Sequence, residues 1–167
     1  INRGGFPEVV QRPAARRRDW FASYVTTILQ RDVRDLSNIE GLTQAPRLLA
    51  LLAARSSGLL NVADVSRDAG IPHSTLQRYL ALFEATFMIQ RVPAWSANLG
   101  KRLVKAPKLL VCDTGLMAYL LNVTAPSTLD DVHLGGRFLE TLVGGELLKQ
   151  IEWSKERPTL LHYRTGA

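Results

Sequence analysis

NVADVSRDAGIPHSTLQRYLALFEATF, at residues 61–87, is the stretch of sequence that says most about the fold. A short helix is expected over residues 62–69, and it ends at Gly70 because glycine readily adopts the left-handed conformation that stops a helix. After a turn, a second helix is expected over residues 73–85. Its apolar residues recur at helical spacing and predict one buried face: Leu76, Tyr79, Leu80, Phe83 and Phe87. Two helices around a tight turn are typical of a helix-turn-helix, whose second helix enters the major groove of DNA.

The opposite face of the second helix carries small and polar side chains that suit contact with DNA. These residues are Ser74, Thr75, Gln77 and Arg78, with Ala81 one turn further on. Small side chains let a helix approach a groove closely, while glutamine and arginine can hydrogen-bond base edges or phosphates. The same pattern fits a packing or protein-contact unit with a solvated polar face, so both interpretations stay open.

The charge of the chain favours an anionic partner, with nucleic acid as the first candidate. The 167 residues are 46% apolar and 22% charged, which is ordinary globular composition, and the formal net charge is +6. Residues 1–37 hold seven basic and four acidic side chains, and residues 38–127 hold nine and five. Residues 128–167 hold five basic and six acidic side chains. The positive excess therefore surrounds the helix-turn-helix, and the last segment is neutral to acidic.

The single cysteine and the lack of long apolar runs favour a reducing, cytoplasmic compartment. Cys112 has no partner for an internal disulfide and no cysteine neighbours for a zinc site, so a buried structural role is expected. No apolar run approaches the roughly 18 residues that span a membrane, and no signal-peptide pattern opens the chain. Because the chain begins with Ile1 rather than Met, it is interpreted as a fragment or a processed form.

Residues 38–127 as a whole predict a winged helix. A first helix over 47–55 precedes the pair already described, and two β-prone runs, 88–92 and 108–112, follow with a turn-rich loop over 93–106 between them. This wing would offer four cations to a phosphate backbone: Lys101, Arg102, Lys105 and Lys108. The alternative is that these side chains only keep an exposed loop soluble.

Residues 1–37 predict a connector followed by an amphipathic helix. The helix is expected to begin after Pro13, and Trp20, Tyr24 and Ile28 recur on the face that would be buried.

Residues 128–167 look like the beginning of an α/β unit of the endonuclease type. A helix is expected over 135–150, followed by a β-prone run over 159–163. Within the preceding region, residues 38–127, Asp113 is expected to cap a short helix over 114–121. The residues expected to be buried on the helix over 135–150 are Phe138, Leu139, Leu142, Val143 and Leu147.

Taken together, the helices and short β-prone runs of the chain predict a fold class that is mainly α with a small β component (α+β).

Catalytic and cofactor motifs are missing from the sequence. It contains neither a G-x-x-x-x-G-K-[ST] loop nor a glycine-rich dinucleotide motif. His73, His133 and His162 are far apart and show no metal-ligand spacing. We therefore expect no enzyme activity, metal or cofactor in the chain itself.

Several short motifs follow one another in order through nearly the whole chain. They are Gly4-Gly5-Phe6-Pro7, Trp20, Tyr24, Arg31-Asp32-Val33, Asn61, Gly70-Ile71, Thr75, Tyr79-Leu80, Lys101-Arg102, Lys105-Ala106-Pro107-Lys108, Asp113-Thr114-Gly115-Leu116, Gly136, Glu140, Val143, Glu146-Leu147 and Tyr163-Arg164. In order and spacing they resemble the region after the ATPase module in a large prokaryotic family, the AAA-superfamily ATP-binding proteins with a C-terminal domain of unknown function.

The resemblance implies a longer protein with an N-terminal P-loop ATPase domain, which would bind ATP and magnesium and is absent here. It implies a winged helix in the middle, followed by the start of a restriction-endonuclease-like fold of the PD-(D/E)xK type. Glu140 matches the helix glutamate of that fold by position, while the strand acid and the E-x-K strand would lie beyond Ala167. Metal-dependent phosphodiester hydrolysis needs those groups, so this chain is expected not to cut DNA.

Two functions remain in view. The first is a non-catalytic accessory region of an AAA-superfamily ATP-binding protein that binds DNA through its winged helix, with phosphate contacts that make affinity depend on salt. The second is a protein-interaction or regulatory module that docks on the ATPase domain or on another subunit. An incomplete sheet would also leave an unpaired edge that invites self-association.

Overall fold

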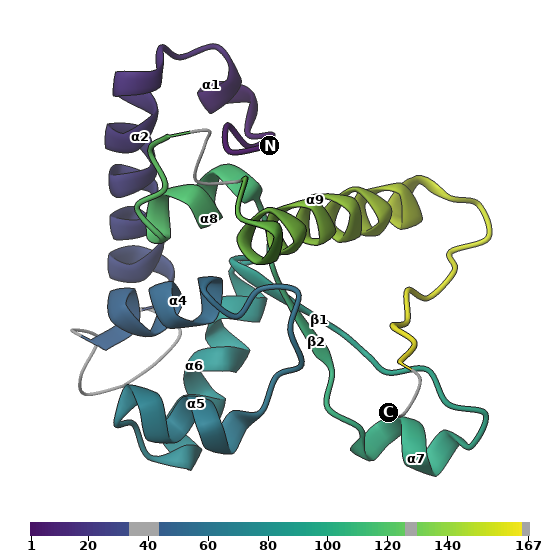
Figure 1. Ribbon diagram of the computed structural model, residues 1–167. Helices are drawn as coiled ribbons and strands as arrows, with labels where there is room; N and C mark the ends of the chain where they lie inside the picture. Colours follow the sequence, from purple (N-terminus) through teal and green to yellow (C-terminus); the bar gives the residue numbers. More distant parts are fainter. Residues whose placement is uncertain (34–43, 126–129, 165–167) are drawn as a thin grey trace.

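The computed structural model describes residues 1–33, 44–125 and 130–164, apart from a few side chains, and shows a mostly helical α+β fold (Figure 1). The helices are α1 (Pro7–Val10), α2 (Ala14–Thr27), α4 (Ala45–Ala53), α5 (Val62–Ala69), α6 (His73–Ala85), α7 (Leu99–Val104), α8 (Thr114–Leu120) and α9 (Val132–Trp153), and a π-helical segment η1 (Ile28–Val33) continues α2. The strands are β1 (Ile89–Val92) and β2 (Lys108–Val111). The expected fold class is confirmed. The expected boundaries at 37–38 and 127–128 lie outside the described residues, as does most of the linker expected at 126–131.

The turn between α5 and α6 forms as the sequence predicts. Gly70 adopts the left-handed conformation, with φ of 67°. The Asn61 side chain begins α5 by accepting hydrogen bonds from the backbone N–H groups of Ala63, at 3.0 Å, and Asp64, at 3.2 Å. This cap satisfies donors that have no partner within a first helical turn. Both helices therefore have the bounds expected of them.

The buried face of α6 is confirmed except at its last expected member. Leu76, Tyr79, Leu80 and Phe83 are all buried in the core. Phe87 lies two residues beyond the helix, where the backbone has turned to a φ of 56°, and its side chain is 70% exposed. The prediction that Phe87 is buried was wrong because it extended the helical spacing past the end of the helix.

Strands β1 and β2 pair antiparallel, with Ile89 opposite Val111 and Val92 opposite Lys108. The expected turn-rich loop between them is wrong in one respect, since α7 (Leu99–Val104) occupies its middle. The leucine, lysine and arginine residues of this segment have high helix propensity, which favours a helix despite the glycine and the prolines around them. The hairpin therefore ends in a helix rather than in an open loop.

Aromatic side chains hold the N-terminal segment against α2. Phe6 lies 5.3 Å from Trp20 and 5.1 Å from Tyr24 between ring centroids, and Trp20 stacks on Tyr24 with an interplanar angle of 8°. Phe21 of α2 packs beside Tyr119 of α8 at 6.0 Å. The expected helix is confirmed, but Trp20, Tyr24 and Ile28 are only partly buried against the core. The buried residues of this stretch are Phe21, Val25 and Leu29.

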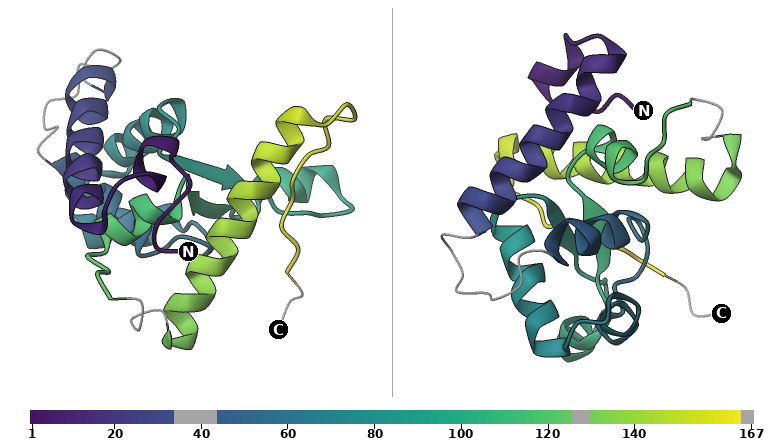
Figure 2. Two further views of the ribbon diagram at one scale, coloured as in Figure 1. Left: turned by 90° about the horizontal axis from the view of Figure 1, so that it is seen from above. Right: turned by 90° about the vertical axis from the view of Figure 1, so that its left-hand side faces the viewer.

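Helix α9 lies along β2 and α8 and is longer than expected (Figures 1 and 2). At Gly144 the helix comes so close that an added Cβ would lie 2.6 Å from the Leu110 side chain. The Thr141 hydroxyl lies 2.8 Å from that of Ser56, and both are buried. Arg137 donates to the carbonyl oxygen of Ala54, at 2.7 Å. These contacts fix α9 to the end of α4 and to the sheet.

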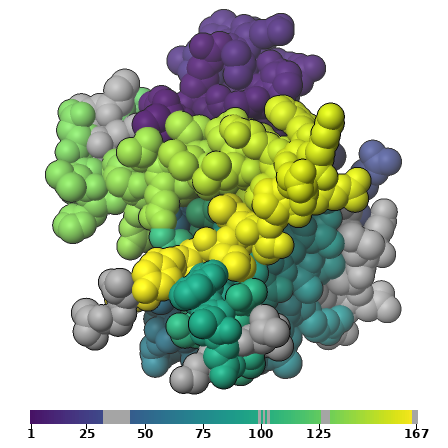
Figure 3. All heavy atoms as spheres, turned by 90° about the vertical axis from the view of Figure 1, so that its right-hand side faces the viewer, coloured from purple at the N-terminus to yellow at the C-terminus, as the bar shows by residue number. Residues whose placement is uncertain are grey.

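Most of the α9 residues expected in the core are not buried there. Phe138 is buried, Leu142 is half-buried, and Leu139, Val143 and Leu147 are 52%, 49% and 42% exposed. The prediction failed because apolar residues occupy both sides of α9, while β2 and α8 cover only one. Figure 3 shows the outer side of the helix, in yellow-green, on the surface of the molecule.

The strand expected over residues 159–163 is also wrong within the described residues, where one parallel bridge forms between Ala94 and His162. His162 donates its backbone N–H to the Pro93 carbonyl oxygen at 2.9 Å and accepts from the Trp95 N–H at 2.7 Å. Trp95 also packs edge-on against Tyr163 at 5.4 Å. These contacts attach the C-terminal segment to the hairpin.

Candidate nucleic-acid interface

The exposed surface of α6 carries the side chains that the sequence assigns to DNA contact. Ser74, Gln77 and Arg78 are exposed, and Thr75 is half-buried. Within the part of the chain that the structure describes, the Arg78 guanidinium has neither a hydrogen bond nor an ion pair. An arginine without an internal partner can donate to a phosphate or to a guanine without breaking a contact of the fold.

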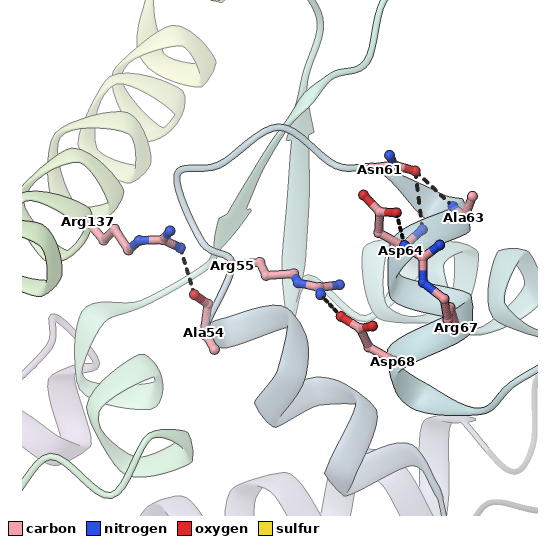
Figure 4. A network of polar contacts seen from close by, with 8 residues as sticks. All are labelled: Ala54, Arg55, Asn61, Ala63, Asp64, Arg67, Asp68 and Arg137. Carbon is pink, nitrogen blue, oxygen red and sulfur yellow. Dashed lines mark hydrogen bonds and ion pairs between the residues drawn. The ribbon is translucent and has the colours of Figure 1, made fainter.

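The acidic side chains of α5 and α6 are each paired with an arginine. Figure 4 shows Asp68 paired with Arg55 and Asp64 paired with Arg67. At the far end of α6, Glu84 pairs with Arg91 of β1. A carboxylate that is neutralised in this way repels an approaching polyanion less than a free one does. The exposed face of α6 therefore carries an arginine without a partner among the described residues, and the acids of α5 and α6 are compensated.

The cations expected in the wing behave differently from one another. Arg102 donates to the Ser96 carbonyl oxygen, at 2.9 Å from Nη2. Lys105 is exposed and pairs with none of the described residues, whereas the Lys101 side chain lies outside the described part. Arg102 is thus held by the fold, and Lys105 is available for a partner.

The Lys108 side chain, which the sequence assigns to phosphate contact, is 28% exposed and already has a partner within the fold. Its ammonium group pairs with Glu140 of α9, and burial lowers the pKa of the lysine. Position 108 lies in β2, so the side chain is directed at the neighbouring helix rather than at the loop. Glu140, which matches a nuclease glutamate by position, is thereby occupied in a structural ion pair.

The predicted DNA-binding residues fall into two groups in space. Figures 1 and 2 (left) show α7 at the far end of the hairpin, away from α5 and α6. The side chains of α6 form one surface, and Lys105 just beyond α7 belongs to another. The structure therefore does not bring all the predicted residues into a single cluster.

Metal-ligating side chains do not cluster in the described residues. The described residues contain no group of three or more histidine, cysteine, aspartate or glutamate side chains that could hold a metal ion. Burial, together with the charge of Asp113, raises the pKa of the Cys112 thiol to about 12. Among these residues, every helix is too short or too polar to cross a lipid bilayer.

One feature near the end of α6 was not predicted from the sequence. Phe87 lines a groove that also takes in the N-terminal segment, β2 and α9. The available signal was a bulky aromatic residue directly after a helix, where glycine is favoured. The face of α6 and this groove are separate surfaces.

Residues 1–127 match a family described as a domain of unknown function, DUF8612. The chain belongs to this family. The match includes α6 and the β1–β2 hairpin and ends before α9, so the DUF8612 region contains the candidate interface.

The DUF8612 chain is similar to two curated mycobacterial proteins. They are the uncharacterized protein Rv2008c of Mycobacterium tuberculosis and the uncharacterized protein Mb2031c of Mycobacterium bovis, each 30% identical over 122 residues. The matched residues cover 72% of this chain and 28% of each relative, so the chain spans less than a third of their length. No solved structure matches the DUF8612 chain.

Proposed function

We propose that the chain binds double-stranded DNA through the exposed face of α6, as a non-catalytic region of a longer protein. The observation that carries this proposal is that Arg78 on that face has no partner among the described residues, combined with the ion pairing of the acids of α5 and α6. Helices α4, α5 and α6 followed by the β1–β2 hairpin have the order of a winged helix, in which the last helix enters the major groove.

Each residue of α6 has a distinct role in this proposal. Arg78 and Gln77 donate to base edges or phosphates, and the small Ser74 lets the helix lie deep in the groove. Thr75 is half-buried, and its methyl group would contact the methyl group of a thymine. Lys105 supplies a separate phosphate contact on the hairpin, which adds affinity without sequence information.

The longer protein is proposed to be a prokaryotic AAA-superfamily ATP-binding protein. The motif order described above supports this, and so does the length of the mycobacterial relatives, of which the chain spans 28%. ATP and magnesium would bind in the ATPase module, where turnover would take place. The present chain would supply the contact with DNA and no chemistry of its own.

The test is the binding of a short fluorescent duplex to the chain at about 50 and 200 mM salt, because phosphate contacts lose affinity steeply over this range. Arg78→Ala should weaken binding about tenfold, which is about 1.4 kcal/mol. Lys155→Ala removes the same charge from an exposed site beyond α9 and is the matched control. Equal losses for both variants, or no binding by the unmodified chain at the lower salt, would contradict the proposal.

A second candidate is a protein-interaction module that docks on the ATPase domain or on another subunit. The exposed Leu139, Val143 and Leu147 side chains favour it, because apolar residues grouped on one surface commonly mark a protein contact. This function predicts association with the separately produced ATPase domain that is lost in Val143→Glu and kept in Arg78→Ala. If the chain instead binds DNA through α6, DNA binding should be weakened in Arg78→Ala and kept in Val143→Glu.

A further inference from the structure

A groove of about 630 Å³ lies between the N-terminal segment, the end of α6, β2 and the second half of α9. Apolar side chains make up much of its lining, among them Phe6, Leu110 and Ile151. Volumes of this size are typical of binding sites in proteins. The groove is formed by elements from both ends of the chain and lies away from the exposed face of α6.

Phe87, at the edge of this groove, has an unfavourable backbone conformation and an exposed apolar side chain. Its N–H donates to the Glu84 carbonyl oxygen at 3.0 Å, and the Met88 N–H donates to that of Phe83 at 2.8 Å. This pair of bonds ends a helix with a left-handed residue, which is usually glycine. Phe87 therefore carries backbone strain at a φ of 56° and also leaves 70% of its side chain exposed. Glycine would remove both costs, so the fold does not require phenylalanine here.

Three charged side chains line the groove, Asp113, Glu152 and Lys149, and their net charge is −1 although the chain as a whole is basic. Glu152 is exposed and has no ion pair among the described residues, and Lys149 is already paired with Glu146. The Asp113 carboxylate accepts two backbone N–H groups. An apolar floor with an uncompensated acid at its rim fits a partner that is apolar and positively charged, and it disfavours nucleic acid.

We propose that this groove binds a polypeptide segment in which apolar side chains flank a lysine or an arginine. Phe87 is the anchor that packs against the apolar side chains of the segment, and Glu152 pairs with its cation. Phenylalanine is among the aromatic residues that are enriched in protein–protein interfaces, where a few anchoring side chains carry most of the binding energy. This inference goes beyond DNA binding and does not depend on it, because the two surfaces share none of these residues.

The experiment uses a random peptide library displayed on phage and selected on the 167-residue chain. Enriched peptides are synthesised, and their binding is measured with the unmodified chain, Phe87→Gly and Glu152→Lys. Trp153→Ala removes an exposed aromatic residue that does not line the groove, and Glu156→Lys reverses an exposed charge outside it. These two variants are the matched controls.

The expected result is enrichment of peptides that combine apolar residues with lysine or arginine. Phe87→Gly should bind them at least about tenfold more weakly, while its urea midpoint stays equal or rises because strain is removed. Glu152→Lys should also weaken binding, and both controls should leave it unchanged. The proposal is overturned by failure to enrich any peptide, by enrichment of acidic peptides, or by unchanged binding in Phe87→Gly. A dimer that forms through Phe87 and excludes the peptides would equally overturn it, since the occupant would then be a second copy.

Discussion

The carboxylate of Asp113 accepts a hydrogen bond from the backbone N–H of Gly5 at 2.6 Å, across 108 positions of sequence. Its other oxygen caps α8 by accepting from the Leu116 N–H at 2.9 Å. Gly4, with a φ of 76°, sits so near that an added Cβ would collide with the same carboxylate. Two motifs that are far apart in sequence therefore form one structural unit, which fixes the N-terminal segment beside the groove.

Asp113→Ala should destabilise the chain by about 2–3 kcal/mol, because it removes a helix cap and a second charge-assisted hydrogen bond. Asp131→Ala is the matched control, since Asp131 caps α9 through one hydrogen bond from the Leu134 N–H at 2.7 Å. It should cost about 1 kcal/mol. Urea unfolding of both variants checks the difference, and equal losses would show that the Gly5 contact contributes nothing.

Gly115→Ala and Gly136→Ala should have opposite effects, although both glycines are helical. A Cβ at Gly115 would lie 2.5 Å from the Arg3 carbonyl oxygen, whereas one at Gly136 would meet nothing within 4 Å. We expect Gly136→Ala to stabilise the chain by up to about 1 kcal/mol through helix propensity. Gly115→Ala should destabilise it, because the N-terminal segment must move away from α8. The thermal unfolding midpoints of the two variants test this prediction. A higher midpoint for Gly115→Ala would contradict the close approach of the Arg3 carbonyl oxygen to Gly115.

The helix pair at the centre of the chain could be predicted because its signals are local. Gly70 is required by a left-handed turn, and the bounds of α5 and α6 follow from the apolar spacing around it. The cap by Asp113 has the same origin, since a carboxylate before a helix binds the N–H groups that follow it. Each of these features depends on residues within a few positions of one another.

The features that sequence reasoning missed depend on partners far away in the chain. Lys108 looked like part of a cationic wing, but its partner Glu140 comes from a helix 32 positions later. The exposure of Leu139 and Val143 depends on which side of α9 the sheet covers, and helical spacing alone cannot choose between two apolar sides. The groove at Phe87 is likewise assembled from both ends of the chain.

Lys105→Ala and Lys108→Ala should differ in their effect on DNA binding. Lys105 is exposed and has no partner among the described residues, while Lys108 pairs with Glu140. Removing one phosphate contact should lower the dependence of log K on log salt by about 1. We expect this for Lys105→Ala and not for Lys108→Ala, which should lower stability instead. Binding titrations at several salt concentrations test it, and a reduced slope for Lys108→Ala would restore that residue to the interface.

Cys112 should react slowly with thiol reagents in the folded chain. Burial raises its pKa from 9.0 to about 12, so the reactive thiolate is scarce near neutral pH. The folded state holds this proton more tightly than the unfolded state. The resulting stability is therefore present below pH 9 and is lost as the pH rises toward 12. Maleimide labelling with and without urea measures the protection, and equal rates in both would contradict it.

The buried hydroxyl contact between Ser56 and Thr141 also bears on the order of folding. It joins residues 85 positions apart, and the Ser56 hydroxyl also accepts from the Val111 N–H at 3.0 Å. Closing such long loops costs chain entropy before any contact repays it. We therefore expect α5 and α6 to form early from their local contacts. During synthesis, the hydrogen bond between Ser56 and Thr141 cannot form until most of the chain has left the ribosome.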